Sequence, residues 1–396
     1  MTTKKGVWNL QQVRDKQLQD LWSYTTDGDA LRLFAWGGNT FGELYLAGIT
    51  GGAPAKRSSP VQIPGTNWKD LSNISGKPPY TSFASKTDGT LWSWGRNQQG
   101  TMGNNSITSI SSPVQIPGTN WTGTYDTMSG SYFTSTAIKT DGTLWSWGYN
   151  GNGQLGLNNR TAYSSPVQIP GTSWTVTATT QGVGYGIKTD GTLWSWGYNV
   201  TGALGQNNRT QYSSPVQIPG TSWSKIATGE RNAFALKTDG TLWSWGRNET
   251  GYLGLNEGGN PGPHTSSPTQ IPGTTWTSNY AVSLQGALAI KTDGTLWSWG
   301  KNVKGHLGHN SDNFNYSSPV QVGSDSTWSS VNVSGDYKVR AIKTDGTLWS
   351  WGYNHRGQLG HNNTTQYSSP VQVGSDNDWA KLGGTGGAVS YAMRGL

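Results

Sequence analysis

The stretch KTDGTLWSWG at residues 139–148 decides the fold, because the same ten letters return at five further places in the chain. These further copies begin at Lys86, Lys188, Lys237, Lys291 and Lys343. A catalytic motif is needed once, whereas a stretch that recurs at a regular period is typical of a repeat architecture. The repeats therefore describe the framework of the molecule before they say anything about its function.

Two further markers repeat in step with this stretch. The tripeptide SSP occurs seven times, and a Trp follows the Pro of each copy by eight or nine residues. A worn form of the Asp-Gly motif, TTDGDALRLFAWG at residues 25–37, brings the count of that motif to seven as well. Successive Asp-Gly pairs lie 49 to 61 residues apart, which is the period of a four-stranded propeller blade with long loops.

The Asp-Gly pair predicts the pairing of two strands in each repeat. Between two Thr it favours a type I′ hairpin turn of two residues, since both central residues need positive φ. Such a turn places Lys139 opposite Leu144 and Ile138 opposite Trp145. Because side chains alternate along a strand, one face of the blade is expected to be bulky and to carry Ile138, Trp145 and Trp147. The other face, which we call the slight face, is expected to carry Ala137, Leu144 and Ser146. We expect the two Trp of one blade to fill the slight face of the next.

These patterns predict an all-β fold, a seven-bladed β-propeller of four-stranded blades over residues 25–396. The strand expected at residues 31–36 has no SSP segment before it, and the C-terminal segment after Pro370 has no LWSWG after it. The N-terminal strand is therefore expected to join the C-terminal blade and close the ring, so that no long strand edge is exposed. A short helical segment in residues 1–24 is expected to precede the propeller.

The pattern KTDGTLWSWGYNGNGQLGLNN at residues 139–159, followed by SSPVQIPG at residues 164–171, resembles the repeats of the regulator of chromosome condensation family. The resemblance covers about residues 25–396 and implies a seven-bladed propeller. It says less about function, because that superfamily includes nucleotide-exchange factors, a plant ultraviolet-B photoreceptor and a bacterial inhibitor of β-lactamases. The GWRHT motif of the photoreceptor is absent from this sequence.

The leader at residues 1–24 resembles the short segment that opens many structural proteins of tailed bacteriophages, which often carry similar TDGTLWSWG repeats. Its apolar residues follow an approximately helical pattern, and we interpret six of them as attachment residues: Trp8, Leu10, Val13, Leu18, Leu21 and Trp22. This helix packs on its own propeller in one interpretation and docks into another virion protein or a second copy of the chain in the other. The resemblance implies localisation in the virion.

Composition excludes several classes of function. The formal net charge is +7, but no basic run or stripe occurs, so a nucleic-acid partner is not expected. The chain has no Cys, which excludes disulfides and cysteine nucleophiles. No apolar stretch is long enough for a signal peptide or a membrane span.

No catalytic motif emerges from the sequence, and we expect neither an enzyme nor a cofactor. GNGQLG at residues 151–156 spells a dinucleotide fingerprint but lies inside a propeller repeat instead of a strand-to-helix turn. His309 and His361 occupy the same position in adjacent repeats, and we interpret them as loop variation because no carboxylate is fixed beside them for a metal site.

One variable residue follows each WG and precedes an Asn, and by symmetry these residues form a ring at one end of the propeller. They are Arg96, Tyr149, Tyr198, Arg247, Lys301 and Tyr353. Tyr and Arg are common at recognition surfaces, so the ring is a candidate binding site for a host glycan or protein; the alternative is that these side chains cover loop backbone. The sequence thus favours a non-enzymatic binding propeller of a phage particle, with a soluble inhibitor or scaffold as the alternative.

Overall fold

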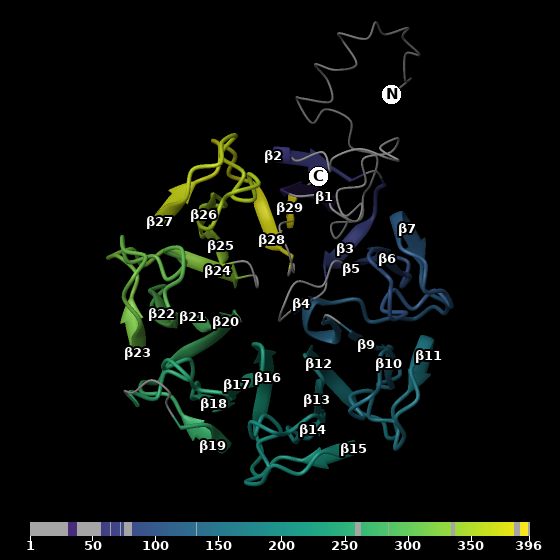
Figure 1. The fold of residues 1–396 in the computed structure, drawn as a ribbon. Helices are drawn as coiled ribbons and strands as arrows, with labels where there is room; N and C mark the ends of the chain where they lie inside the picture. Colours follow the sequence, from purple (N-terminus) through teal and green to yellow (C-terminus); the bar gives the residue numbers. More distant parts are fainter. Residues whose placement is uncertain are drawn as a thin grey trace, which may run out of the picture.

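The computed structural model describes residues 31–37, 57–63, 65–71, 73–74, 81–131, 133–257, 263–283, 285–333, 337–383 and 389–394. Within these residues the strands form seven sheets around a central axis, as predicted (Figure 1). The described part of the chain contains one 3-10 helix, η1 (Tyr125–Thr127), and no α-helix. The helical segment expected in residues 1–24, with its six attachment residues, lies outside the described residues.

Each blade has four antiparallel strands, which we name A to D from the axis to the rim. Blade 1 consists of β3 (Trp68–Leu71), β5 (Thr81–Lys86), β6 (Leu91–Gly95) and β7 (Ile110–Gln115). Blade 2 consists of β8 (Met128–Gly130), β9 (Thr134–Ile138), β10 (Leu144–Gly148) and β11 (Tyr163–Gln168). In blade 2 a fifth strand, β4 (Asn73–Ile74), which follows β3 in the chain, pairs parallel with the A strand β8. Blade 3 consists of β12 (Trp174–Thr180), β13 (Val183–Lys188), β14 (Leu193–Gly197) and β15 (Tyr212–Gln217). Blade 4 consists of β16 (Trp223–Thr228), β17 (Asn232–Lys237), β18 (Leu242–Gly246) and β19 (Thr265–Gln270). Blade 5 consists of β20 (Trp276–Val282), β21 (Gly286–Lys291), β22 (Leu296–Gly300) and β23 (Tyr316–Gln321). Blade 6 consists of β24 (Trp328–Val333), β25 (Lys338–Lys343), β26 (Leu348–Gly352) and β27 (Tyr367–Gln372).

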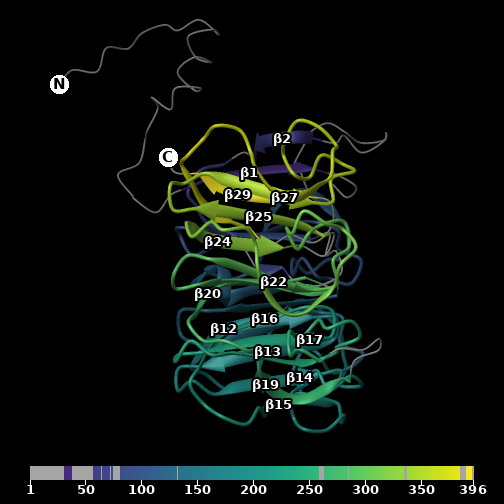
Figure 2. The same cartoon turned by 90° about the vertical axis from the view of Figure 1, so that its left-hand side faces the viewer.

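Blade 7 is shared between the two ends of the chain. Its inner strands are β28 (Trp379–Leu382) and β29 (Val389–Arg394), and its outer strands are β1 (Arg32–Gly37) and β2 (Arg57–Gln62). The strands β1 and β29 are antiparallel neighbours, with Phe34 opposite Ala392 (Figure 2). The predicted closure of the ring is confirmed, and it involves two N-terminal strands instead of one.

The strand pairing at the Asp-Gly turn differs from the prediction by one residue. In blade 2, Leu144 lies opposite Ile138 and Trp145 lies opposite Ala137. Gly142 has φ of 76°, and its N–H donates to the Lys139 carbonyl, so the loop is a three-residue type I turn with a Gly bulge. Because side chains alternate along a strand, Ile138 belongs with Leu144 on the slight face, and the prediction that placed it beside Trp145 is wrong.

Seven apolar clusters, one at each junction between neighbouring blades, form the core. The cluster between blades 3 and 4 joins Tyr185 and Leu193 of one blade to Trp223 and Trp245 of the next. Trp245 is fully buried and donates its indole N–H to the Ala203 carbonyl of blade 3, whereas Trp243 lies at the edge of the cluster. The Trp face of each blade therefore fills the face of its neighbour, as expected, with the second Trp of LWSWG at the centre.

The SSP segments also join the blades. The loop between strands C and D, which we name the C–D loop, reaches the D strand of the next blade, where the Asn158 N–H donates to the Ser213 carbonyl at 2.8 Å. A Cβ on Gly153 of the same loop would lie 2.7 Å from the Ser213 Cα. This close approach requires Gly in the loop and leaves room only for a small residue in the strand, which explains why both recur.

Candidate functional site

The propeller presents two ends, which we name by the connections found there. The C–D end carries the A–B turns and the C–D loops, and the Asp-Gly end carries the Asp-Gly turns and the D–A loops. Strand direction places the ring predicted from the sequence at the C–D end, because each of its residues follows the end of a C strand. The backbone N–H of Tyr149 bonds to the Phe133 carbonyl, and Tyr198, Arg247, Lys301 and Tyr353 make the equivalent bond.

The ring side chains have different environments. Arg247 forms ion pairs with Glu249 at 2.6 Å and Glu230 at 3.0 Å, and its hydrogen bonds lower the pKa of Glu249. Tyr353 stacks on His355 with ring centroids 4.3 Å apart. Tyr149 is 39% exposed and contacts the ring of Phe133 at 5.7 Å.

The remaining ring residues are half-buried. Arg96 Nε donates to Gln98 at 2.9 Å, and the Arg231 guanidinium lies 5.2 Å from the ring of Tyr198. Lys301 is half-buried as well. The invariant Asn after each ring residue is buried and holds its C–D loop, as Asn150 does by accepting the Leu155 N–H.

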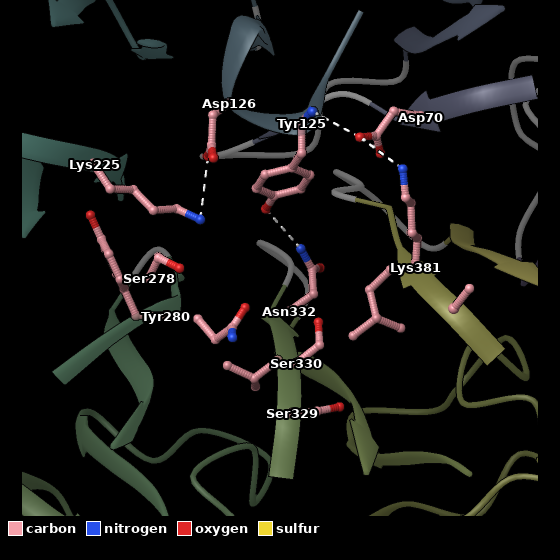
Figure 3. A pocket seen from close by; sticks show the side chains of 14 residues that line it. Asp70, Tyr125, Asp126, Lys225, Ser278, Tyr280, Ser329, Ser330, Asn332 and Lys381 are labelled. Carbon is pink, nitrogen blue, oxygen red and sulfur yellow. Dashed lines mark hydrogen bonds and ion pairs between the residues drawn. The ribbon is translucent and has the colours of Figure 1, made fainter. Parts of the chain in front are cut away.

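A cavity of about 480 Å³ lies at the mouth of the central channel on the Asp-Gly end (Figure 3). In several blades the side chain two positions after the Trp that opens the A strand lines it, and Asp70, Lys225 and Lys381 are three of these. Lys225 pairs with Asp126 at 3.3 Å, and Lys381 pairs with Asp70 at 3.4 Å. The four charges of the mouth therefore neutralise one another.

Tyr125 reaches into this cavity from blade 2. Eighteen positions separate Trp121 from Lys139, against fourteen between Trp174 and Lys188, and the extra residues form η1. The hydroxyl of Tyr125 bonds to Asn332 Nδ2 of blade 6 at 3.2 Å, and burial raises the pKa of this phenol. The contact joins blades that are not neighbours in the ring.

Arg340 continues this network beneath the cavity. It is fully buried between blades 6 and 7 and donates to Asn332 Oδ1 at 2.7 Å and to the carbonyls of Tyr391 and Gly383. Burial lowers the pKa of this guanidinium to about 10. Arg340, Asn332 and Tyr125 form a brace across the channel, which we name the channel brace.

Asp70 is the buried carboxylate of the mouth. Burial raises its pKa, while Lys381 and the backbone N–H groups of Leu71 and Tyr125 lower it. Its oxygens are thus occupied by donors of the protein itself. Asp70 contributes to holding blades 1, 2 and 7 together.

The repeated His residues bond inside their own blades. His309 Nε2 lies 2.8 Å from Ser298 Oγ, and His361 Nε2 lies 2.9 Å from Ser350 Oγ. Ser298 Oγ already donates its proton to the Leu307 carbonyl, so it accepts from the imidazole. A nucleophilic Ser needs the opposite proton direction, because the His must take its proton. In the described parts of the chain, no three His, Asp or Glu residues are placed to hold a metal ion.

Sequence reasoning did not identify the residues of the channel mouth. Tyr125 and Arg340 stand where other blades carry different residues, so the repeat gives no indication of them. The longer spacing between Trp121 and Lys139 indicates extra residues in blade 2, but Trp68 and Lys86 of blade 1 are equally far apart, so it does not point to Tyr125. Within the described residues, no helix is long and apolar enough to cross a bilayer.

The regulator of chromosome condensation (RCC1) repeat model matches six segments, which together make up more than half of the chain: residues 88–134, 141–181, 190–236, 239–279, 293–338 and 345–382. Protein RCC2 of Homo sapiens is 36% identical over 97 residues, which are 24% of this chain and 18% of RCC2. The ultraviolet-B receptor UVR8 of Arabidopsis thaliana is 32% identical over 92 residues, which are 23% of this chain and 21% of UVR8. The chain therefore matches about a fifth of the length of these relatives.

Two solved structures share the whole propeller. Prp20p of Saccharomyces cerevisiae superposes with a TM-score of 0.79 and 20% identity over 93% of this chain and 92% of that chain. Human WBSCR16 gives a TM-score of 0.76 and 19% identity over 92% of this chain and 99% of that chain. At this level of identity the likeness shows the fold alone.

Proposed function

Because this chain belongs to the regulator of chromosome condensation (RCC1) repeat family, we propose that it is a protein-binding propeller without enzymatic activity of its own. Prp20p, which shares the fold, is described with its binding to Gsp1p and histones, and a second structure has it bound to Kap60. These partners belong to Prp20p. What carries over to our proposal is the use of a propeller as a binding surface.

The distribution of exposed apolar side chains carries this proposal. The large hydrophobic residues that are exposed in the described part of the chain are Ile107, Tyr149, Val200 and Phe314, and all four lie in C–D loops. They lie in blades 1, 2, 3 and 5, one in each, and so belong to the same end of the propeller. Exposed apolar and aromatic side chains on one face are typical of a protein interface. The ring residues begin the same loops, so the C–D end is the surface that we propose for the partner.

The proposal of a non-enzymatic role rests on the Ser–His geometry. Ser298 and Ser350 are fully buried, and each donates to a backbone carbonyl. Neither is available to attack a substrate. A rigid framework with broad loop surfaces fits recognition better than chemistry.

Photo-crosslinking in the producing cells tests the proposed surface. A photoreactive phenylalanine at Tyr149 should form covalent protein adducts, whereas the same group at Gln168, exposed on the outer strand β11, should not. The triple variant R96S/R247S/K301S should reduce the adducts at position 149 at least severalfold, because it removes three charged contacts from the ring. A matched variant with Ser at Arg160, in the same kind of loop but outside the ring, should leave them unchanged.

Absence of adducts at Tyr149, or equal adducts at both positions, contradicts the proposal. Unchanged adducts in the triple variant contradict the role of the ring and leave the role of the C–D end in place. The virion assignment and attachment through Trp8, Leu10, Val13, Leu18, Leu21 and Trp22 concern residues outside the described ones, and they stay predictions. Host glycans and other virion proteins stay predicted partners on the same footing.

A further inference from the structure

The Lys that opens each repeated stretch lies between two Trp rings at the Asp-Gly end. Lys139 Nζ lies 4.3 Å from the ring centroid of Trp145 and 5.0 Å from that of Trp121. Lys86, Lys188, Lys237, Lys291 and Lys343 make the same pair of contacts, at 3.9 to 5.2 Å. Contact with two aromatic faces holds a long side chain in place, so the position of the ammonium is fixed in advance.

Blades 6 and 7 show what such a cation binds. In blade 6, Asp325 Oδ2 lies 2.7 Å from Lys343 Nζ. In blade 7 the Lys is replaced by Arg394, which pairs with Asp378 at 2.8 Å and with Asp376 at 3.1 Å. The D–A loops before these two blades contain GSD, at residues 323–325 and 374–376. The chain thus places its own carboxylate on the cation in these two blades.

The other five blades have the cation without the carboxylate. Their D–A loops contain PGT in place of GSD. Among the described residues, these five Lys form no ion pair, although each is half-buried at the same position: Lys86, Lys139, Lys188, Lys237 and Lys291. They belong to the consecutive blades 1 to 5 and therefore form one arc of the ring (Figure 1).

Each of these Lys has a carboxylate two residues further along the chain, the Asp of the Asp-Gly turn. Asp141 accepts the N–H and the hydroxyl of Thr143, and these hydrogen bonds lower its pKa more than Lys139 does. Blade 6 carries the same turn, with Asp345 bonded to Thr347 in the same way. Lys343 nevertheless binds Asp325 there, so the turn Asp leaves room for a second carboxylate on the Lys.

We infer that the five unpaired Lys form a binding arc for an acidic peptide segment, whose carboxylates take the place that Asp325 has in blade 6. A single exposed ion pair is weak, so the affinity comes from several Lys that engage one segment together. The neutral channel mouth at the same end neither attracts nor repels such a segment, because its charges are paired. This surface is opposite the C–D end and is independent of the function proposed above.

Fluorescence anisotropy of the full chain with a labelled peptide of about ten Glu tests the inference. We expect binding that weakens strongly when the salt concentration rises from about 50 to about 300 mM, because surface ion pairs are screened. The triple variant K139Q/K188Q/K237Q should lose about tenfold or more in affinity, and the corresponding Arg variant should retain it, since each exposed pair contributes a factor of a few. All variants should keep the thermal midpoint of the parent within a few degrees.

Two blade 6 variants are matched controls within the same molecule. K343Q should leave the affinity unchanged, because Lys343 is already paired. D325N should raise the affinity, because it frees a sixth Lys. Crosslinking at Tyr149 in the triple Gln variant should be unaffected, which separates this inference from the function proposed for the C–D end.

Three results overturn the inference: no binding of the acidic peptide, equal loss in K343Q and in the triple variant, or binding that the triple variant leaves intact. A single-stranded DNA of about ten nucleotides, another flexible polyanion, is the comparison ligand. Equal or tighter binding of the DNA through the same Lys overturns the assignment to an acidic peptide, because it shows general recognition of polyanions.

Discussion

At the scale of single residues, the repeated letters are explained by contacts that each of them makes. Asp141 accepts from Thr143, and the Thr143 hydroxyl accepts the indole N–H of Trp145 at 2.9 Å. Trp145 in turn supports Lys139 with its ring. Lys139, Asp141, Thr143 and Trp145 are therefore required by these contacts, and Gly142 is required by its positive φ. These structural requirements explain why the five residues recur in each copy without a catalytic role.

His306 gives the molecule a predictable response to acid. It lies buried in the C–D loop of blade 5, and burial lowers its pKa from 6.5 to about 4. Since the unfolded chain binds this proton at a higher pH than the folded one, the free energy of unfolding should fall as the pH drops from 6.5 to 4, by roughly 3 kcal/mol from this group. Urea denaturation at several pH values measures the effect.

The variant H306Q isolates the contribution of His306. Gln occupies the equivalent position in blades 2 and 6, as Gln154 and Gln358, so the substitution suits the loop. The loss of stability between pH 6.5 and 4 should be smaller in H306Q than in the parent, while His309 and His361, whose pKa values are also lowered by burial, contribute equally to both. Identical pH profiles would show that His306 is not buried as a neutral ring.

At the scale of elements, the hairpins show why the strand register was predicted wrongly while the strands were not. Asp-Gly is compatible with two turns, and the sequence pattern alone favours the shorter one. The structure has the three-residue turn, in which the Asp carboxylate bonds to Thr143 two residues on and Gly142 alone takes positive φ. This choice depends on side-chain hydrogen bonds and on the adjacent D–A loop, neither of which the alternation of apolar residues reports.

The two Trp of LWSWG have unequal roles in each blade, and this can be measured. Trp196 is fully buried between blades 2 and 3 and donates to the Gln154 carbonyl at 2.9 Å, whereas Trp194 is half-buried at the edge of the same cluster. W196F should therefore lower the free energy of unfolding by about 2 kcal/mol or more, and W194F by about 1 kcal/mol. Equilibrium denaturation followed by intrinsic fluorescence compares them; an equal or larger cost for W194F would contradict the packing described here.

At the scale of the whole molecule, the sequence predicts what every blade repeats and misses what one blade does alone. The number of blades, their four strands and the closure of the ring follow from counting three markers. The channel brace does not, because Tyr125 comes from an insertion in blade 2 and Arg340 stands where blades 3 and 4 carry Tyr185 and Phe234. Contacts across the axis depend on the final curvature of the ring, which no local pattern encodes.

Ring closure should control both stability and association. A chain that begins at Gly65 lacks β1 and β2 and exposes the edge of β29. We expect a lower melting temperature and association of copies through this edge, because an unpaired strand edge is a template for pairing. Light scattering after size exclusion compares it with the full chain, and addition of a peptide of residues 31–63 should reverse the association. If the shortened chain has the same oligomeric mass and the same melting temperature as the full chain, then β1 and β2 contribute little to stability and do not prevent association.

The division of blade 7 between the chain ends also sets an order of events during protein synthesis. The strand β1, with β2 beside it, leaves the ribosome about 350 residues before β29, its partner on the other side. At translation rates of roughly 5 to 20 residues per second, β1 waits on the order of 20 to 70 seconds for β29. Blades 1 to 6 can stack in the order in which they are made, but the ring closes only after the last strand emerges. A chain that stops before β29 therefore leaves β1 with one unpaired edge, and an unpaired strand edge is a site for pairing with another chain.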